Sequence, residues 1–517
     1  MLCFHVWSKR YCPSRYPQDP VTTCSWTAAA SWPAVLVQAL VVLFSVAVYR
    51  RYLSPLSDIP GPFWASITRL WQVVHIFKGD QNLESIALHD KYGHFVRIAP
   101  NEVSVSHPDG PKSLLLTPQR KADWYRVFTV PDYRYETPMS TLDPQEKIER
   151  SKWLAPGFSL SNILRSEDYM NKNITLLLEW MDKFAESGDL MHLDEYLTYT
   201  AFDNAGEAIF SQSFGFIKEG KDIRGSIANN MVLNPYVAAA GFFIWAYVLL
   251  IANPIITWTG LLPMGHLFNT ANAAMKKRRE NPDARFDIAA HWFKAQRENP
   301  GRLSDRDIQA QATIAVGAGS DTVSCGIQTF VYHMLRNQDS WLRARKEVTE
   351  AQAEGRCQDR VVSYDDAQRL PYLQACIKEA LRMFGPTPMG LPRKAPKGGV
   401  AIGDRHFPEG TTLSIHLHVM QQSKECWGPD AREWNPERWF AADAASKEKY
   451  WLIFGLGYNS CPGQHLAKVQ LSKMAATFVR DYDIRQVDPT VTWSWKAYFT
   501  VVPHSWPVYI SKKATAE

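Results

Sequence analysis

The chain has 517 residues, of which 46% are hydrophobic and 21% are charged, and its formal net charge is +5. A chain of this length can bury a substantial core, as one large domain or as a few smaller ones. The positive charge is mild and forms no dense stripe of Lys and Arg, so it gives no reason to expect a nucleic-acid partner. The eight cysteines include no CxxC pair and no zinc-type spacing, which predicts no disulfide framework and a reducing compartment for the globular part.

The first predicted element is a membrane anchor. No Asp, Glu, Lys or Arg occurs from Pro20 to Tyr49, and about 20 apolar residues suffice to span a bilayer. We therefore expect a tail over residues 1–26, an uncleaved transmembrane anchor over residues 27–49 and a proline-rich hinge over residues 50–62. Basic residues flank the anchor on both sides, so the charge pattern leaves its orientation open.

A second charge-free tract runs from Gly225 to Met275 and is most apolar between residues 236 and 252. One further membrane crossing there would place residues 50–235 and 276–517 on opposite sides, although the motifs described below belong to one site. We therefore expect this tract to lie in the membrane interface, or to form a pocket lid that dips into lipid.

The rest of the chain predicts a mainly helical domain with a minor β part. From Phe286 to the early 380s the pattern indicates successive helices, and Ser304 with Asp307 forms a capping signature at the start of a long one. The alternation from Val400 to Met420 predicts a short β-hairpin. Residues 497–511 are also expected to be extended.

A loop that contains a cysteine precedes the helix predicted from Gln464 to Asp481. Residues 454–463 read Phe-Gly-Leu-Gly-Tyr-Asn-Ser-Cys-Pro-Gly. The glycines allow a tight turn, and the helix dipole with the loop N–H groups is expected to lower the pKa of the Cys461 thiol. A buried structural cysteine is the plainer alternative, but this spacing favours metal ligation.

Further segments suit catalysis or a buried ionic network. Residues 318–322 read Ala-Gly-Ser-Asp-Thr inside the predicted long helix. A glycine there costs about 1 kcal/mol relative to alanine, so it indicates the close approach of a flat ligand or a local distortion. An acid beside an alcohol suits proton delivery. Glu379 and Arg382 share one helix face, and residues 434–439 follow them as Trp-Asn-Pro-Glu-Arg-Trp.

These segments, in this order, resemble the signatures of the cytochrome P450 family. Residues 454–463 resemble its haem-binding loop, phenylalanine–glycine–x–glycine–x–arginine–x–cysteine–x–glycine, except that Asn459 stands in place of the arginine. The resemblance implies the cytochrome P450 fold, mainly α with a minor β part, as a single catalytic domain over residues 63–517. It also implies haem b (iron protoporphyrin IX) as the cofactor.

The resemblance implies a role for each matching residue. Asp321 and Thr322 would be catalytic residues that deliver protons, and Cys461 would be the metal ligand. Glu379, Arg382 and Arg438 would form a buried structural network. The residues that bind the cofactor would be Cys461, Arg393, Phe454, Gly457, Asn459 and Gly463.

Two departures from the family pattern concern the haem propionates. Asn459 brings no positive charge, and the family's early W-x-x-x-R signature is not intact, because Lys147 and Ser151 stand where Trp and Arg are expected. Arg150 and Lys152 lie alongside. The sequence leaves open which basic group takes over, and the haem would depend more on Arg393.

The resemblance implies a membrane-bound monooxygenase of fungal type that inserts one oxygen atom of O2 into a lipophilic small molecule, by hydroxylation or epoxidation. A terpenoid, polyketide or alkaloid intermediate of fungal secondary metabolism is the expected substrate class. The chain lacks a dinucleotide-type glycine motif, so electrons are expected from a separate NADPH–cytochrome P450 reductase. The expected location is the endoplasmic reticulum membrane, with a single span and a cytosolic catalytic domain.

Two alternatives remain open. A haem-thiolate isomerase or peroxygenase would keep the haem without oxygen activation by the Asp–Thr pair. A haem-binding or sterol-binding membrane protein would have no turnover at all.

Overall fold

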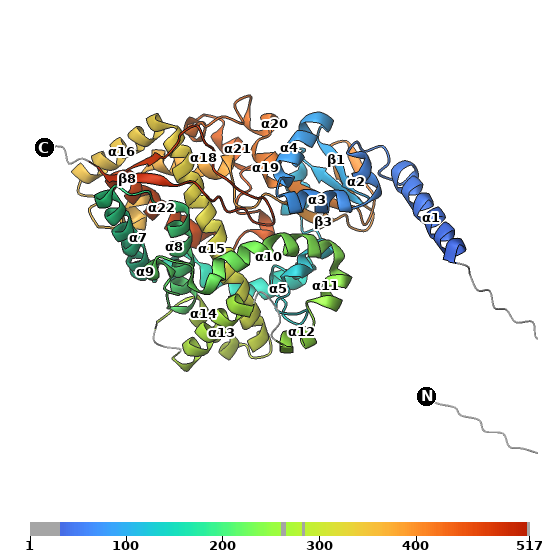
Figure 1. Ribbon diagram of the computed structural model, residues 1–517, viewed down its shortest axis with the longest axis horizontal. Helices are drawn as coiled ribbons and strands as arrows, with labels where there is room; N and C mark the ends of the chain where they lie inside the picture. The colour runs from blue at the N-terminus through green and yellow to red at the C-terminus, as the bar shows by residue number, and fades with distance from the viewer. Residues whose placement is uncertain (1–31, 260–264, 282–284, 514–517) are drawn as a thin grey trace, which may run out of the picture.

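The computed structural model describes residues 32–259, 265–281 and 285–513 (Figure 1). Most of the ordered segments are helices and a minority are short strands, which confirms the predicted fold class. The helices are α1 Trp32–Val48, α2 Phe63–Ile67, α3 Leu70–Lys78, α4 Gln81–Tyr92, α5 Pro144–Leu154, α6 Leu160–Leu164, α7 Glu167–Ser187, α8 Leu193–Phe210, α9 Phe216–Glu219, α10 Ser226–Ala240, α11 Ile244–Leu250, α12 Pro254–Thr259, α13 Gly265–Glu280, α14 Ile288–Glu298, α15 Asp305–Arg336, α16 Gln338–Ala353, α17 Tyr364–Gln368, α18 Pro371–Met383, α19 Leu417–Gln421, α20 Lys424–Trp427, α21 Ala444–Glu448 and α22 Gln464–Asp481.

The strands form one larger sheet and two hairpin-like pairs. The larger sheet has the order β1-β2-β6-β3, in which β2 and β6 are parallel and the other neighbours antiparallel. In the pairs, β4 lies against β5 and β7 against β8. The strands are β1 Phe95–Ala99, β2 Glu102–Val105, β3 Gly390–Lys394, β4 Val400–Ile402, β5 Arg405–Phe407, β6 Thr412–His416, β7 Tyr482–Gln486 and β8 Val508–Lys512.

The hairpin predicted over Val400 to Met420 is only partly correct. Its first part is the β4–β5 hairpin, but β6 leaves that pair and joins the larger sheet, where all five of its residues are buried. The chain then enters α19. Alternation shows that a segment is extended and says nothing about its partner, which burial against β2 and β3 decides.

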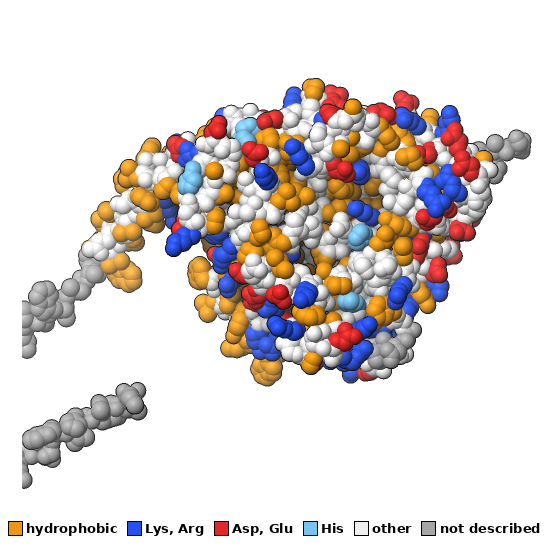
Figure 2. All heavy atoms as spheres, turned by 180° about the vertical axis from the view of Figure 1, so that it is seen from behind, with side chains coloured by type: hydrophobic (Ala, Val, Ile, Leu, Met, Phe, Trp, Pro, Cys, Tyr) orange, Lys and Arg blue, Asp and Glu red, His pale blue; other side chains and the backbone are white. Residues whose placement is uncertain are grey.

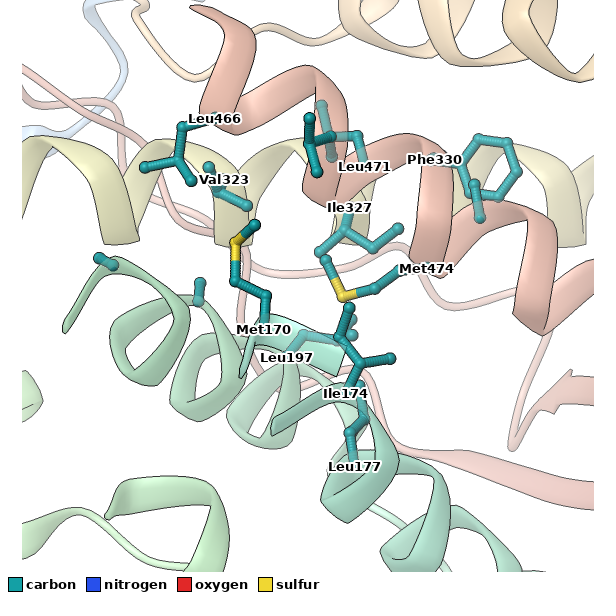
Figure 3. Close-up of a cluster of buried hydrophobic side chains, with 14 of the residues drawn as sticks. Met170, Ile174, Leu177, Leu197, Val323, Ile327, Phe330, Leu466, Leu471 and Met474 are labelled. Carbon is teal, nitrogen blue, oxygen red and sulfur yellow. The ribbon is translucent and has the colours of Figure 1, made fainter. Parts of the chain in front are cut away.

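The long helix α15 lies in the centre of the fold and contributes many residues to the main buried cluster. Its predicted cap is confirmed, because Asp307 donates its backbone N–H to the Ser304 hydroxyl oxygen while the Asp307 carboxylate accepts from the Ser304 N–H. The predicted helix Gln464–Asp481 is confirmed as α22. Side chains from α7, α8, α15 and α22 meet in one buried cluster (Figure 3), which includes Met170, Ile174, Leu177, Leu197, Val323, Ile327, Phe330, Leu466, Leu471 and Met474. This packing fixes α15 and α22 relative to each other.

The helix α1 projects away from the body of the molecule (Figure 1), and it contributes no buried residue. Hydrophobic side chains cover it (Figure 2). With the π-helical turn η1 (Tyr49–Leu53) it forms one of two helical stretches, Trp32–Leu53 and Ile223–Leu250, that are long and apolar enough to cross a membrane. The first coincides with most of the predicted anchor, whose residues 27–31 lie outside the described part of the chain.

The second apolar stretch is not one straight helix. It comprises η5 (Ile223–Gly225), α10, η6 (Gly241–Phe243) and α11, and Pro235 lies inside α10. One side packs on the body, where the indole N–H of Trp124 donates to Ala238 O over 2.8 Å. Trp245 is nevertheless 73% exposed. The stretch therefore lies against the folded domain with an apolar outer face.

Candidate active site

A cavity of about 600 Å³ lies between α15, the loop before α22, and α5 with the segment that follows it. Most of its wall is apolar, with Leu154, Ile314, Leu391 and Phe499 among the lining side chains. Of the predicted site residues, Thr322, Arg393, Phe454, Asn459, Cys461 and Gly463 line it. Segments that are far apart in the sequence therefore share one enclosed space.

The loop before α22 presents Cys461 to this cavity. The Cys461 N–H donates to Phe454 O over 2.7 Å, which closes the loop. Gly455 and Gly457 have φ values of +67° and +60°, which side-chain-bearing residues rarely adopt. A Cβ at Gly457 would also stand 2.9 Å from Leu115 O. Among the cysteines in the described residues, Cys325, Cys357, Cys376 and Cys426 are buried, and Cys461 alone has an open surface.

The expectation of a lowered thiol pKa is wrong for the protein alone. Burial raises the pKa of the Cys461 thiol, and the backbone N–H groups of Gly463 and Gln464 oppose that shift only in part. The side chain faces open space, but protein surrounds that space, so a thiolate there is less favourable than in bulk water. A bound cation would restore the balance toward the thiolate.

One face of α15 forms another wall of the cavity. Gln311, Ala315, Gly319 and Thr322 lie along it at helical spacing. The Thr322 hydroxyl donates to Ala318 O over 2.7 Å, one turn back along the helix. A Cβ at Gly319 would meet only Ala205, at 3.9 Å, so the protein leaves open space there. Asp321 is 7% exposed and does not belong to the described cavity lining.

Basic side chains gather on one side of the cavity, and we call Lys121, Lys147 and Arg393 the cationic wall. They are 3%, 8% and 1% exposed, respectively. Lys121 Nζ donates to Pro138 O and Met139 O, Lys147 Nζ to Tyr458 O. Arg393 donates to the Tyr125 hydroxyl over 3.1 Å, and its Nε has no partner. The sequence left the role of Lys147 undecided and gave Lys121 no role in binding the cofactor, because a single lysine carries no motif.

The predicted structural residues lie together outside the cavity lining. One Glu379 oxygen accepts from Arg382 Nη2 at 2.8 Å and from Arg438 Nε at 3.0 Å, and the other accepts from Arg382 Nε at 2.9 Å. Arg382 also donates to Gln421 O and Ala431 O, both at 2.6 Å. Arg438 has a second carboxylate partner in Asp430. The side chains of Glu379 and Arg382 are fully buried.

The remaining site expectations fare differently. Gly457 shapes the cysteine loop but is not among the described cavity-lining residues. Thr387, Phe499 and Thr500 also line the cavity, whereas residues 232–245 contribute no described residue to the lining. Those residues pack against η3 (Asp123–Phe128), where the Trp124 indole N–H donates to Ala238 O, and Tyr125 of η3 lines the cavity.

Fold and site together define a helical protein that offers one cysteine ligand to an enclosed, largely apolar cavity with a cationic side. A family model of cytochrome P450 matches residues 60–500. The chain therefore belongs to the cytochrome P450 family, and it is an enzyme of the haem-containing monooxygenase type.

Fungal proteins are among its relatives. Cytochrome P450 monooxygenase gsfF of Penicillium aethiopicum is 28% identical over 90% of this chain and 95% of its own length. A cytochrome P450 monooxygenase of Aspergillus terreus is 30% identical over 88% of this chain and 95% of its own length. Cytochrome P450 monooxygenase pkfB of Emericella nidulans is 30% identical over 88% of this chain and 90% of its own length.

The residues present fit the haem that this family carries. Cys461 supplies a sulfur ligand toward the cavity, and Gly319 leaves room on the α15 side. The cationic wall suits the haem carboxylates, and Arg393 Nε and Asn459 Nδ2 are buried donors with no partner in the protein. The donor set, the open space and the charge therefore agree with the cofactor.

Proposed function

We propose that this protein is a membrane-anchored haem b monooxygenase that hydroxylates or epoxidises a lipophilic small molecule of fungal secondary metabolism. A terpenoid, polyketide or alkaloid intermediate is the proposed substrate class. The observation that carries the proposal is that Cys461 and Thr322, from separate elements, line the same largely apolar cavity. The fungal relatives are named as cytochrome P450 monooxygenases, which supports the reaction type.

The proposed mechanism divides the work between cofactor and chain. Haem held through Cys461 would supply the activation of dioxygen, from which the transferred oxygen atom comes. The apolar lining binds the substrate and excludes bulk water from the reacting atoms. Thr322 Oγ1 holds its proton on Ala318 O and can pass a proton into the cavity when that bond exchanges. Asp321, the next residue back on α15, would resupply the proton.

Exposed apolar surface that suits contact with a lipid bilayer supports a lipophilic substrate class. Large apolar side chains are exposed on α3, α10, α11 and α12 as well as on α1, and the rings of Phe77 and Tyr236 join α3 to α10 at 5.7 Å. Surfaces of this kind favour contact with membrane. We place the protein at the endoplasmic reticulum membrane, with one span, the domain over residues 63–517 on the cytosolic side, and NADPH–cytochrome P450 reductase as its electron donor.

The test is spectroscopic and catalytic. Reduced protein in membranes should give a thiolate-type carbon monoxide difference band, and Cys461→Ala should abolish it. Membranes that contain the protein and the reductase should then oxidise candidate metabolites only with NADPH, as followed by mass spectrometry. Absence of the band would contradict the haem-thiolate site, and product formation without reductase or NADPH would favour an isomerase or peroxygenase.

The Asp–Thr pair has its own test. Thr322→Ala should lower the product formed per NADPH consumed and raise peroxide release, because protons reach the cavity less selectively. Thr313→Ala is the matched control, since Thr313 makes the same hydroxyl bond one turn back, to Gln309 O at 2.9 Å, outside the cavity lining. Equal coupling in both variants would contradict the proposed role of Thr322 in proton delivery.

A further inference from the structure

The cationic wall is a concentration of buried basic side chains that have no acidic partner among the described residues. The described residues that line the cavity include no Asp or Glu. The hydrogen-bond acceptors of Lys121, Lys147 and Arg393 are backbone carbonyls and the Tyr125 hydroxyl, and no ion pair of the described residues includes any of the three. Buried charges are normally paired, so the arrangement lacks an anion.

Electrostatics show that the three groups act on one another. Burial, with smaller contributions from the charges of Lys147 and Arg393, lowers the pKa of Lys121 to about 6. Burial likewise lowers the pKa of Lys147 to about 8, with Arg393 as the neighbouring charge. No carboxylate opposes either shift. An anionic group between these side chains would offset their mutual repulsion. It would also accept charge-assisted hydrogen bonds from them.

The helix α5 offers a single basic side chain to this space. Lys147 and Ser151 lie one turn apart on its cavity side. Arg150 forms ion pairs with Glu136, Glu146 and Asp307, and Lys152 is exposed. The structure thus excludes two of the basic groups that the sequence left open.

The cysteine loop adds a neutral donor to the same side. Asn459 lines the cavity and its Nδ2 is buried without a partner. Lys147 also reaches this loop, because its Nζ donates to Tyr458 O and stands 5.2 Å from the centre of the Tyr458 ring. Lys147 on α5 therefore lies beside the cysteine loop, in which Asn459 brings no positive charge.

We propose that Lys147, together with Lys121 and Arg393, binds the haem carboxylates and supplies the positive charge that positions 151 and 459 lack in this chain. The inference rests on the haem of the proposed function. Asn459 contributes a neutral hydrogen bond. Lys147 and Lys121 thereby take the place of the cations missing from position 151 of α5 and position 459 of the cysteine loop.

Haem retention tests the inference without reference to turnover. Lys147→Gln removes the charge but keeps a donor for Tyr458 O, and Lys147→Arg keeps the charge. Lys152→Gln, on the exposed side of the same helix, is the matched control. The measurements are haem bound per chain and the rate of haem transfer to an excess of apomyoglobin.

We expect Lys147→Gln to lose haem about tenfold to a hundredfold faster than the wild-type protein, which is the range for a hydrogen bond to a charged group. Lys147→Arg and Lys152→Gln should stay near the wild-type rate. Adding Ser151→Arg to Lys147→Gln places a cation one turn along the same face and should restore retention.

Wild-type retention by Lys147→Gln, in a protein that still shows the thiolate-type band, would overturn the inference and leave the proposed function standing. A wild-type protein without haem would instead overturn the proposed function. Failure of Ser151→Arg to restore retention, when Lys147→Gln has lost it, would likewise contradict a role based on charge. Thermal unfolding of the haem-free variants separates loss of haem from loss of fold.

Discussion

Two buried clusters of basic side chains differ in one respect, which is the presence of carboxylates. In the Glu379 network, Arg382 and Arg438 share Glu379, and Asp430 adds a second acid. In the cationic wall, comparable side chains face a cavity with only neutral acceptors. The first cluster is complete within the protein and stabilises the fold. The second cluster has no acidic partner among the described residues, so it is suited to bind an anion.

The largest expected effect comes from removing the acid of the complete cluster. Glu379→Ala leaves two buried guanidinium groups without their shared carboxylate, and it should destabilise the protein by about 3–5 kcal/mol. Chemical denaturation of the purified protein measures the change. Glu448→Ala is the control, because Glu448 pairs with Lys378 at the surface and should cost less than about 1 kcal/mol. Similar losses of unfolding free energy in both variants would contradict the difference between the two clusters.

Replacing an arginine by lysine in each cluster sharpens the comparison. Arg382→Lys keeps the charge but loses the fork that bonds both Glu379 oxygens and two carbonyls, and we expect a loss of about 2–3 kcal/mol. Arg393→Lys should cost the haem-free protein less than about 1 kcal/mol, since Arg393 bonds only neutral acceptors. Equal losses of unfolding free energy in the two haem-free variants would contradict this difference.

Removing a charge from the incomplete cluster should have the opposite sign. The pKa of Lys147 is lowered from 10.5 to about 8 by burial, so its charged form is less stable in the folded than in the unfolded chain. The resulting penalty is absent above the unfolded pKa and grows as the pH falls toward the folded value. Lys147→Gln should therefore stabilise the haem-free protein by about 1–3 kcal/mol at pH 7, and the gain should shrink as the pH approaches 10. Destabilisation at pH 7 would contradict an unpaired charge.

A buried base can also remain neutral, as His418 does. Its effect on the free energy of unfolding is the smallest expected here at pH 7. His418 lies between Gly385 O at 2.8 Å and Asn82 Nδ2 at 3.1 Å, and burial lowers its pKa to about 4. Its contribution to stability is complete above the unfolded value of 6.5 and is lost as the pH falls toward 4, at about 1.4 kcal/mol per pH unit. His418→Gln should flatten the fall in melting temperature between pH 7 and pH 5. An unchanged slope would contradict the assignment.

Much of the local structure could be predicted because it depends on neighbouring residues. The cap formed by Ser304 and Asp307, the helix from Gln464 to Asp481 and the tight turn before Cys461 each follow from residues a few positions apart. The partner of β6 could not be predicted, because alternation in Thr412–His416 does not specify which strand lies beside it.

The sequence by itself determined the cysteine loop, the acid and alcohol on the long helix and the mainly helical class, because periodicity and motif spacing are local properties of the chain. Only the tertiary structure decided which basic side chain faces the cavity, since Lys147, Arg150 and Lys152 are nearly equivalent in sequence and differ only in which face of α5 is buried. It also decided the direction in which the pKa of the Cys461 thiol shifts, because desolvation depends on everything packed around the thiol. Burial is a property of the whole fold, and local pattern does not contain it.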